Sequence, residues 1–156
     1  MTRRAARGRP ERGRGALLAL GLAAALACPG AAAERGPRAN YVLRCAGCHG
    51  MEGAGTVIGG VPSFHGSVAT LANDDLGRTY MLHVPGVTGA SLSDAEIAAV
   101  LTYVVERWGE APAPAFTAEE VTRRRAEPVA DVVALRRAIA LRLAAEGKPL
   151  ADYPWP

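Results

Sequence analysis

The sequence predicts an all-α protein made of three or four short helices, followed by a helical C-terminal extension. The strongest support is an amphipathic stretch at Asp94–Trp108, and a second stretch of this kind spans residues 131–146. Much of the rest is rich in the 18 Gly and 11 Pro residues of the chain, which favour loops between short elements. Aromatic residues make up only 5% of the chain, so a large aromatic core is not expected.

The first 33 residues have the three parts of a cleaved secretory signal. Six arginines precede residue 15, an apolar run fills residues 16–27, and three alanines stand before Glu34. A run of that length is too short to cross the roughly 30 Å hydrocarbon layer of a membrane as a helix. We therefore predict that residues 1–33 are a signal peptide and that the mature protein is periplasmic.

Cys28 allows an alternative interpretation of this leader. It follows Ala25-Leu26-Ala27, which loosely resembles the motif at which a cysteine is lipidated and becomes the mature N-terminus. Association with a membrane is expected only in that case. The simpler interpretation is that Cys28 is removed with the leader.

The net charge of +3 belongs to the leader. From residue 34 onward the chain contains 12 basic and 14 acidic residues, so its remaining part is slightly acidic. Nothing in this balance indicates nucleic-acid binding.

The predicted core domain covers residues 34–110. A brief helix at 41–45 leads into a cysteine motif, and residues 50–77 are expected to be mostly loop, with one short helix near 67–71. Another short helix ends at Tyr80-Met81-Leu82, and the sequence Val84-Pro85-Gly86-Val87 stops it.

The last helix of this domain is the most strongly predicted one. Ser93 and Glu96 form a capping box at its start. Apolar residues then recur at helical spacing and form one stripe, namely Ile97, Leu101, Val104 and Trp108. Gly109 is a suitable stop.

Residues 111–156 are predicted to be a linker and a helical C-terminal extension. Alternating Ala and Pro at 111–115 form a semi-rigid spacer, and Thr117 with Glu120 makes a second capping box. The arginines at 123–125 are expected to form a solvated helix face. Asp131 can cap the final helix, at 131–146.

The residues that indicate chemistry are Cys45-Ala46-Gly47-Cys48-His49. This pattern is the attachment motif of c-type haem. Two thiols three residues apart on one helical turn can each reach a vinyl group of the same porphyrin, and the adjacent histidine then projects toward the iron. We predict one covalent haem c, bound through Cys45 and Cys48, with His49 as the proximal iron ligand.

Two other uses of the cysteine pair are less favoured. A thioredoxin-like redox pair needs a βαβ context, and no strand pattern surrounds this segment. A zinc site needs a partner Cys or His pair at ligand spacing, which is absent from the sequence.

Residues 38–109 resemble a class I bacterial monohaem cytochrome c. The resemblance rests on YVLRCAGCHGMEGAG, VPSFHG, GRTYMLHVPGV and LSDAEIAAVLTYVVERW. The last two segments also loosely resemble small cytochromes linked to methylamine utilisation. The family implies a small cytochrome c fold, in which an N-terminal and a C-terminal helix cross beside the haem, here residues 41–45 and 94–108.

The resemblance also implies roles for residues outside the motif. Pro62 falls where the family has a proline whose carbonyl accepts the N–H of the proximal histidine. Arg78 precedes the distal loop and is a candidate partner for a haem propionate. In the family a methionine before a proline usually supplies the sixth iron ligand, but here Val84 precedes Pro85. Met81 is the candidate distal ligand and His83 the alternative.

The leading functional prediction is a periplasmic electron carrier. It would pass single electrons between a dehydrogenase and an oxidase or another cytochrome. The sequence shows no acid–base or nucleophile constellation, so we do not predict an enzyme. A haem-based small-ligand binder or sensor, with an open or weak sixth site, is the alternative, and a thiol oxidoreductase is a third hypothesis.

Overall fold

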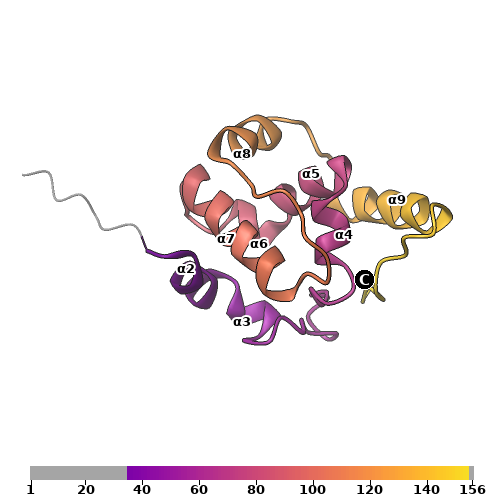
Figure 1. Cartoon of the computed structure of the whole chain (residues 1–156), viewed down its shortest axis with the longest axis horizontal. Coiled ribbons are helices and arrows are strands. Elements are labelled where there is room, and N and C mark those ends of the chain that lie inside the picture. Colours follow the sequence, from indigo (N-terminus) through magenta and orange to yellow (C-terminus); the bar gives the residue numbers. More distant parts are fainter. Residues whose placement is uncertain (1–34, 155–156) are drawn as a thin grey trace, which may run out of the picture. The chain divides into compact units, whose positions relative to one another are not determined.

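Helices form the regular structure of residues 35–154, the part of the chain that the computed structural model describes (Figure 1). The described residues contain no strand beyond an isolated bridge between Thr56 and Val61. The all-α prediction is confirmed. The predicted signal peptide and Cys28 lie outside the described residues. The helices are α2 Pro37–Arg44, α3 Ala46–His49, α4 Val68–Ala72, α5 Asp75–His83, α6 Pro85–Thr88, α7 Asp94–Trp108, α8 Ala118–Arg125 and α9 Val132–Ala145.

Helix α7 has the bounds and the cap that its sequence predicts. The Ser93 hydroxyl accepts a hydrogen bond from the Glu96 backbone N–H at 3.2 Å, and the Glu96 carboxylate accepts one from the Ser93 N–H at 3.0 Å. Each bond satisfies a donor that the start of a helix would otherwise leave unpaired. All four residues of the predicted stripe are buried. Helix α2 packs against α7, as the resemblance to cytochromes c implies.

Helices α2 and α5 begin at other residues than predicted. Helix α2 begins four residues earlier than predicted, at Pro37, because proline is well suited to the first helical turn. Helix α5 begins inside the segment that is expected from sequence to be loop. Its N-cap is Asp74, whose carboxylate accepts a hydrogen bond from the Gly77 N–H at 2.8 Å.

Pro85 ends one helix and begins another. Val84 is extended, with φ of −63° and ψ of 142°, so α5 stops at the residue before it. The predicted stop is therefore found, but the residues that follow form the single helical turn α6 rather than an open turn.

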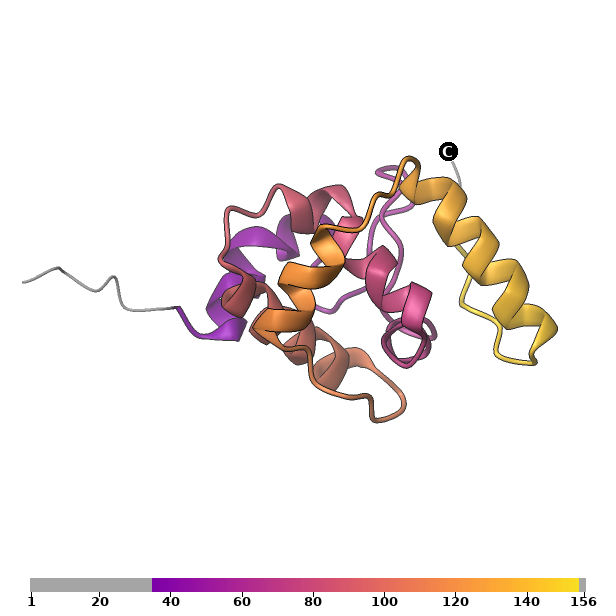
Figure 2. The ribbon, with the colours of Figure 1, turned by 90° about the horizontal axis from the view of Figure 1, so that it is seen from above.

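The C-terminal extension is part of the same folded body as the core domain. Helix α8 packs against α7 and α5, and α9 packs against α5, as Figures 1 and 2 show from two directions. One hydrophobic cluster contains side chains from both parts of the chain. The extension supplies Phe116, Val121, Ile139 and Leu143 to it.

The extension differs from the prediction at α8. Thr117 caps the helix by accepting from the Glu120 N–H at 3.2 Å, but the Glu120 carboxylate binds arginines and does not return to the cap. Arg123 and Arg125 are exposed as expected, whereas Arg124 is only 5% exposed. The interpretation of the arginine run as a solvated face is therefore wrong for Arg124, because it pairs with carboxylates on α5 and α8.

Within residues 35–154, no helix has the length and apolar character needed to cross a membrane.

Candidate functional site

Helix α3 positions both thiols and the histidine of the motif. Cys45 stands at its N-cap and His49 is its last residue, so Cys45 and Cys48 lie within one turn. Cys45 is half-buried and Cys48 is exposed, and both thiols are free. The two sulfurs can therefore be approached from outside while the helix holds them at fixed spacing.

Aromatic side chains pack beside His49. Its imidazole stacks on the Phe64 ring with the ring centroids 4.1 Å apart and the planes at 16°. Behind Phe64 lies Trp108 of α7, at 5.4 Å between centroids, and Tyr41 of α2 lies 4.7 Å from Trp108. Phe64 thus links the histidine to Trp108 of α7 and Tyr41 of α2 through aromatic contacts.

The loop after α3 returns to satisfy the carbonyls at the end of that helix. The Gly55 N–H donates to the His49 carbonyl at 3.0 Å, and the Thr56 hydroxyl donates to the Cys48 carbonyl at 2.9 Å. The Tyr41 hydroxyl donates to the Gly50 carbonyl at 2.5 Å, and burial raises the pKa of Tyr41 to about 12. These bonds fix the motif from the helix before it and from the loop behind it.

Gly55 is required by the close return of this loop. Its φ is +73°, and a Cβ atom placed there would lie 2.4 Å from the Val61 carbonyl oxygen and 2.6 Å from the Pro62 carbonyl. A side chain at this position would push away the segment that contains Pro62. The site depends on that approach because Pro62 is the residue whose carbonyl faces His49.

The surroundings of His49 favour the neutral form of its imidazole. Burial lowers the pKa of its imidazole, and a hydrogen bond to the Pro62 carbonyl raises it by a smaller amount. The Pro62 carbonyl is near His49, but the two groups do not meet the geometric criteria of a hydrogen bond. Nδ1 of His49 is therefore buried without a hydrogen-bond partner in the described structure. A neutral imidazole with its Nδ1 close to a carbonyl is suited to metal ligation through the other nitrogen.

The cysteines lack the electrostatics of a redox-active pair. Burial raises the pKa of Cys45, and the neighbouring Cys48 raises it further. Reactive cysteines require the opposite shift, toward thiolate at neutral pH. The environment therefore favours anchoring of a cofactor over thiol–disulfide exchange.

The two candidates for the sixth ligand lie in different environments. Met81 is 6% exposed and belongs to the hydrophobic core. His83 lies at the end of α5, and both of its ring nitrogens face backbone carbonyls, Nδ1 at 2.8 Å from Thr79 and Nε2 at 3.0 Å from Glu127. His83 is thus held by backbone carbonyls, and the thioether of Met81 lies in the core.

Arg78 does not have the environment expected for a propionate partner. It is 8% exposed, its guanidinium lies 3.7 Å from the centre of the Phe116 ring, and it binds the Glu120 carboxylate twice at 2.6 Å. Its other N–H groups donate to the carbonyls of Ala72, Pro114 and Ala115. With these donors engaged, Arg78 joins the extension to α5.

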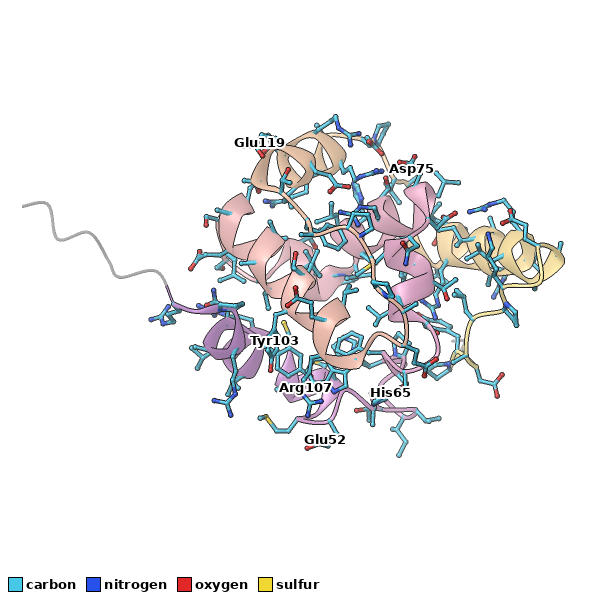
Figure 3. All side chains as sticks on the ribbon, in the orientation of Figure 1. Glu52, His65, Asp75, Tyr103, Arg107 and Glu119 are labelled. Atoms are coloured by element: carbon cyan, nitrogen blue, oxygen red, sulfur yellow. The ribbon has the colours of Figure 1, made fainter. Side chains whose placement is uncertain are left out.

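The residues present fit a covalently attached haem. Two free thiols at the correct spacing, a neutral histidine next to them and a buried Nδ1 beside a carbonyl are together the features that such a group requires. Figure 3 labels Glu52, His65, Tyr103 and Arg107 on the side of the molecule where α3 lies. The fold and this motif define a c-type cytochrome.

Comparison with known proteins agrees with this class. No family model matches the chain. A cytochrome c-552 from Thermus thermophilus is 33% identical over 145 residues, a match that covers 78% of this chain and 97% of the relative. A second cytochrome c-552 from Thermus thermophilus is 34% identical over 128 residues, covering 67% of this chain and 97% of the relative. The chain belongs to the cytochrome c family that these proteins represent.

The comparisons also bear on the limits of the resemblance. The first match covers 78% of this chain, which is more than the predicted core domain, residues 34–110, could supply alone. Neither relative connects the chain to methylamine utilisation, so that narrower resemblance has no support.

Two residues that build the site were not predicted from the sequence. Phe64, which stacks on His49, and Thr56, which holds the Cys48 carbonyl, were not singled out. The glycines around Thr56 were the available signal, because closely spaced glycines after a motif often mark a tight return of the backbone.

Proposed function

We propose that the mature chain is a periplasmic electron carrier with one covalent haem, which exchanges single electrons between a dehydrogenase and an oxidase or another cytochrome. The observation that supports this most strongly is the motif on α3, with its free thiols and a half-buried histidine whose pKa is lowered by burial, in a chain of the cytochrome c family. When bound, the haem supplies one-electron redox chemistry at its iron. The chain supplies attachment, ligation and surroundings.

In this proposal each residue has one role. Cys45 and Cys48 form the two thioether links, and His49 is the proximal ligand. The Pro62 carbonyl orients the His49 ring and increases its basicity. Met81 is the sixth ligand, since a His/Met pair favours a high reduction potential, which suits a carrier in oxidative metabolism.

The test compares Met81→Leu with Met51→Leu. Both changes nearly conserve volume, so a modest cost below about 1.5 kcal/mol is expected in the core. Met51 is the other methionine of the described residues and is 53% exposed, which makes it a matched control. We expect the long-wavelength absorption band of a methionine–iron bond in the oxidised wild type and in Met51→Leu, and its loss in Met81→Leu.

The alternative function predicts a different pattern. A haem-based ligand binder with an open sixth site would show no such band in the wild type and would bind carbon monoxide readily when reduced. Spectra of the reduced proteins with and without carbon monoxide decide between the carrier and the ligand binder.

A further inference from the structure

Helix α5 is joined to the C-terminal extension by polar contacts along its length. At its start, the Asp75 carboxylate accepts from Arg124 of α8 at 2.5 Å. In the next turn, the Thr79 hydroxyl donates to the Glu127 carboxylate at 2.9 Å and accepts from Arg124 at 2.8 Å. At its end, His83 faces the Glu127 carbonyl at 3.0 Å. Figure 3 shows Asp75 at the end of α5 that lies beside α8.

The centre of this interface is a buried group of charges, Arg78, Glu120 and Arg124. Glu120 accepts from Arg78 at 2.6 Å and from Arg124 at 2.7 Å, and the side chains of both arginines are less than 10% exposed. Removing one member of a buried ionic group leaves its partner uncompensated, which is costly. The group therefore ties α8 to α5 more firmly than ion pairs at the surface would.

Helix α9 contacts a further residue of α5. The Arg136 guanidinium lies 5.3 Å from the centre of the Tyr80 ring, and Arg136 is 2% exposed. The extension thus contacts five residues of α5, which are Asp75, Arg78, Thr79, Tyr80 and His83.

Met81 lies on the opposite side of the same helix from the Glu127 contacts. Residues two apart on an α-helix point in nearly opposite directions, and Met81 is two residues from both Thr79 and His83. Its side chain is 6% exposed and belongs to the one hydrophobic cluster that joins core residues such as Trp108 to residues of the extension such as Val121. Thr79 and His83 therefore contact the extension from the side of α5 that faces away from Met81, whereas Arg78, three residues before Met81, lies on the neighbouring face.

We propose that the C-terminal extension is a positioning element for the sixth iron ligand. It fixes the rotation and depth of α5, and this holds Met81 against the iron. Loosening the extension weakens the methionine–iron bond before the helices unfold. This inference rests on the proposed function, because it requires Met81 to be the ligand.

The test uses the full-length haem-loaded protein and one substitution on each side of the interface. Glu120→Gln weakens the contact from α8, and Thr79→Val weakens it from α5 while keeping the side-chain shape. Arg125→Gln is the control, since Arg125 pairs with Asp94 of α7 at 2.5 Å and not with α5. The readouts are the methionine–iron band, carbon monoxide binding to the reduced protein, and helical circular dichroism, all followed with temperature.

The expected result is a separation of ligation from folding. In Glu120→Gln and Thr79→Val, carbon monoxide affinity rises about tenfold, a size typical of coupling between two sites. The methionine–iron band weakens at temperatures where the helical signal is unchanged. Arg125→Gln keeps the wild-type band and affinity until it unfolds.

Two results would overturn the inference, and they differ. If all three variants keep the band until the helices melt, the extension only stabilises the fold. If Met81→Leu leaves the wild-type spectrum unchanged, Met81 is not the ligand, and the proposed ligation fails together with this inference.

Discussion

The haem-attachment segment and the interface between α5 and the extension are stabilised in contrasting ways. In the segment from Cys45 to Gly55, side-chain polar contacts are few, one thiol is exposed and Nδ1 of His49 is buried without a full hydrogen bond. At the interface, Arg78, Glu120 and Arg124 satisfy one another at distances of 2.6 to 2.7 Å. The first region has thiols that its own chain does not engage, and in the second the three charged side chains pair with one another.

This difference indicates where each region obtains its stability. A buried charge is tolerated only when it is paired, so the interface must be formed from the chain itself. A haem site can leave its two thiols unpaired, since attachment to the cofactor engages them. Substitutions of the two cysteines should accordingly act on cofactor loading, and substitutions of the paired charges should act on folding stability.

The largest effect is expected from removing the thiols. Cys45→Ser together with Cys48→Ser should abolish covalent haem, because no other cysteine remains in the described residues to form a thioether. Intact mass of the exported protein and the haem spectrum after denaturation measure this. Single variants serve as controls and should retain one link. Covalent haem in the double variant would contradict the assignment.

A smaller but clear effect is expected at Gly55. Gly55 has a left-handed backbone conformation, and the Cβ atom of Gly55→Ala would lie 2.4 Å from a backbone carbonyl oxygen. We expect the substitution to lower the free energy of unfolding by more than about 2 kcal/mol. We expect a lower melting temperature and disturbed ligation by His49, because the Pro62 segment must move.

Gly47→Ala is the matched control for this change. A Cβ at Gly47 meets nothing within 4 Å, and the residue lies in α3. Alanine should therefore be neutral or slightly stabilising there. Equal destabilisation by the two substitutions would show that the close return of the loop is unimportant.

The smallest expected effect is a dependence of stability on acid pH. Hydrogen bonds from Arg78, opposed by burial and assisted by Arg124, lower the pKa of Glu120 from 4.5 to about 2. A carboxyl with a lowered pKa in the folded state stabilises it fully above the unfolded value, and this contribution is lost as pH falls from about 4.5 toward 2.

Denaturant unfolding of the wild type and Glu120→Gln across this range isolates the contribution. The difference in unfolding free energy between them should shrink by roughly 1 to 3 kcal/mol between about pH 5 and pH 2. Taking the difference removes the shared acid sensitivity of His49. A constant difference would mean that Glu120 titrates normally in the folded protein.

The sequence determined the features that depend on neighbouring residues. The spacing of Cys45, Cys48 and His49 implied haem attachment, and the Ser93–Glu96 box implied the start of α7, because helical geometry alone relates such residues. The all-α fold and membership of the cytochrome c family followed from these signals and are confirmed. The individual ligand assignments, Met81 above all, remain predictions.

Only the tertiary structure decided which distant residues meet. Arg78 binds Glu120 across 42 positions, and Arg124 binds Asp75 across 49. From sequence, an arginine that is buried and paired looks the same as one that faces solvent or a propionate. The partner is brought close by chain folding and leaves no local pattern, so the burial of Arg124 was not predicted, whereas the Cys45–His49 motif is a local pattern that the sequence itself displays.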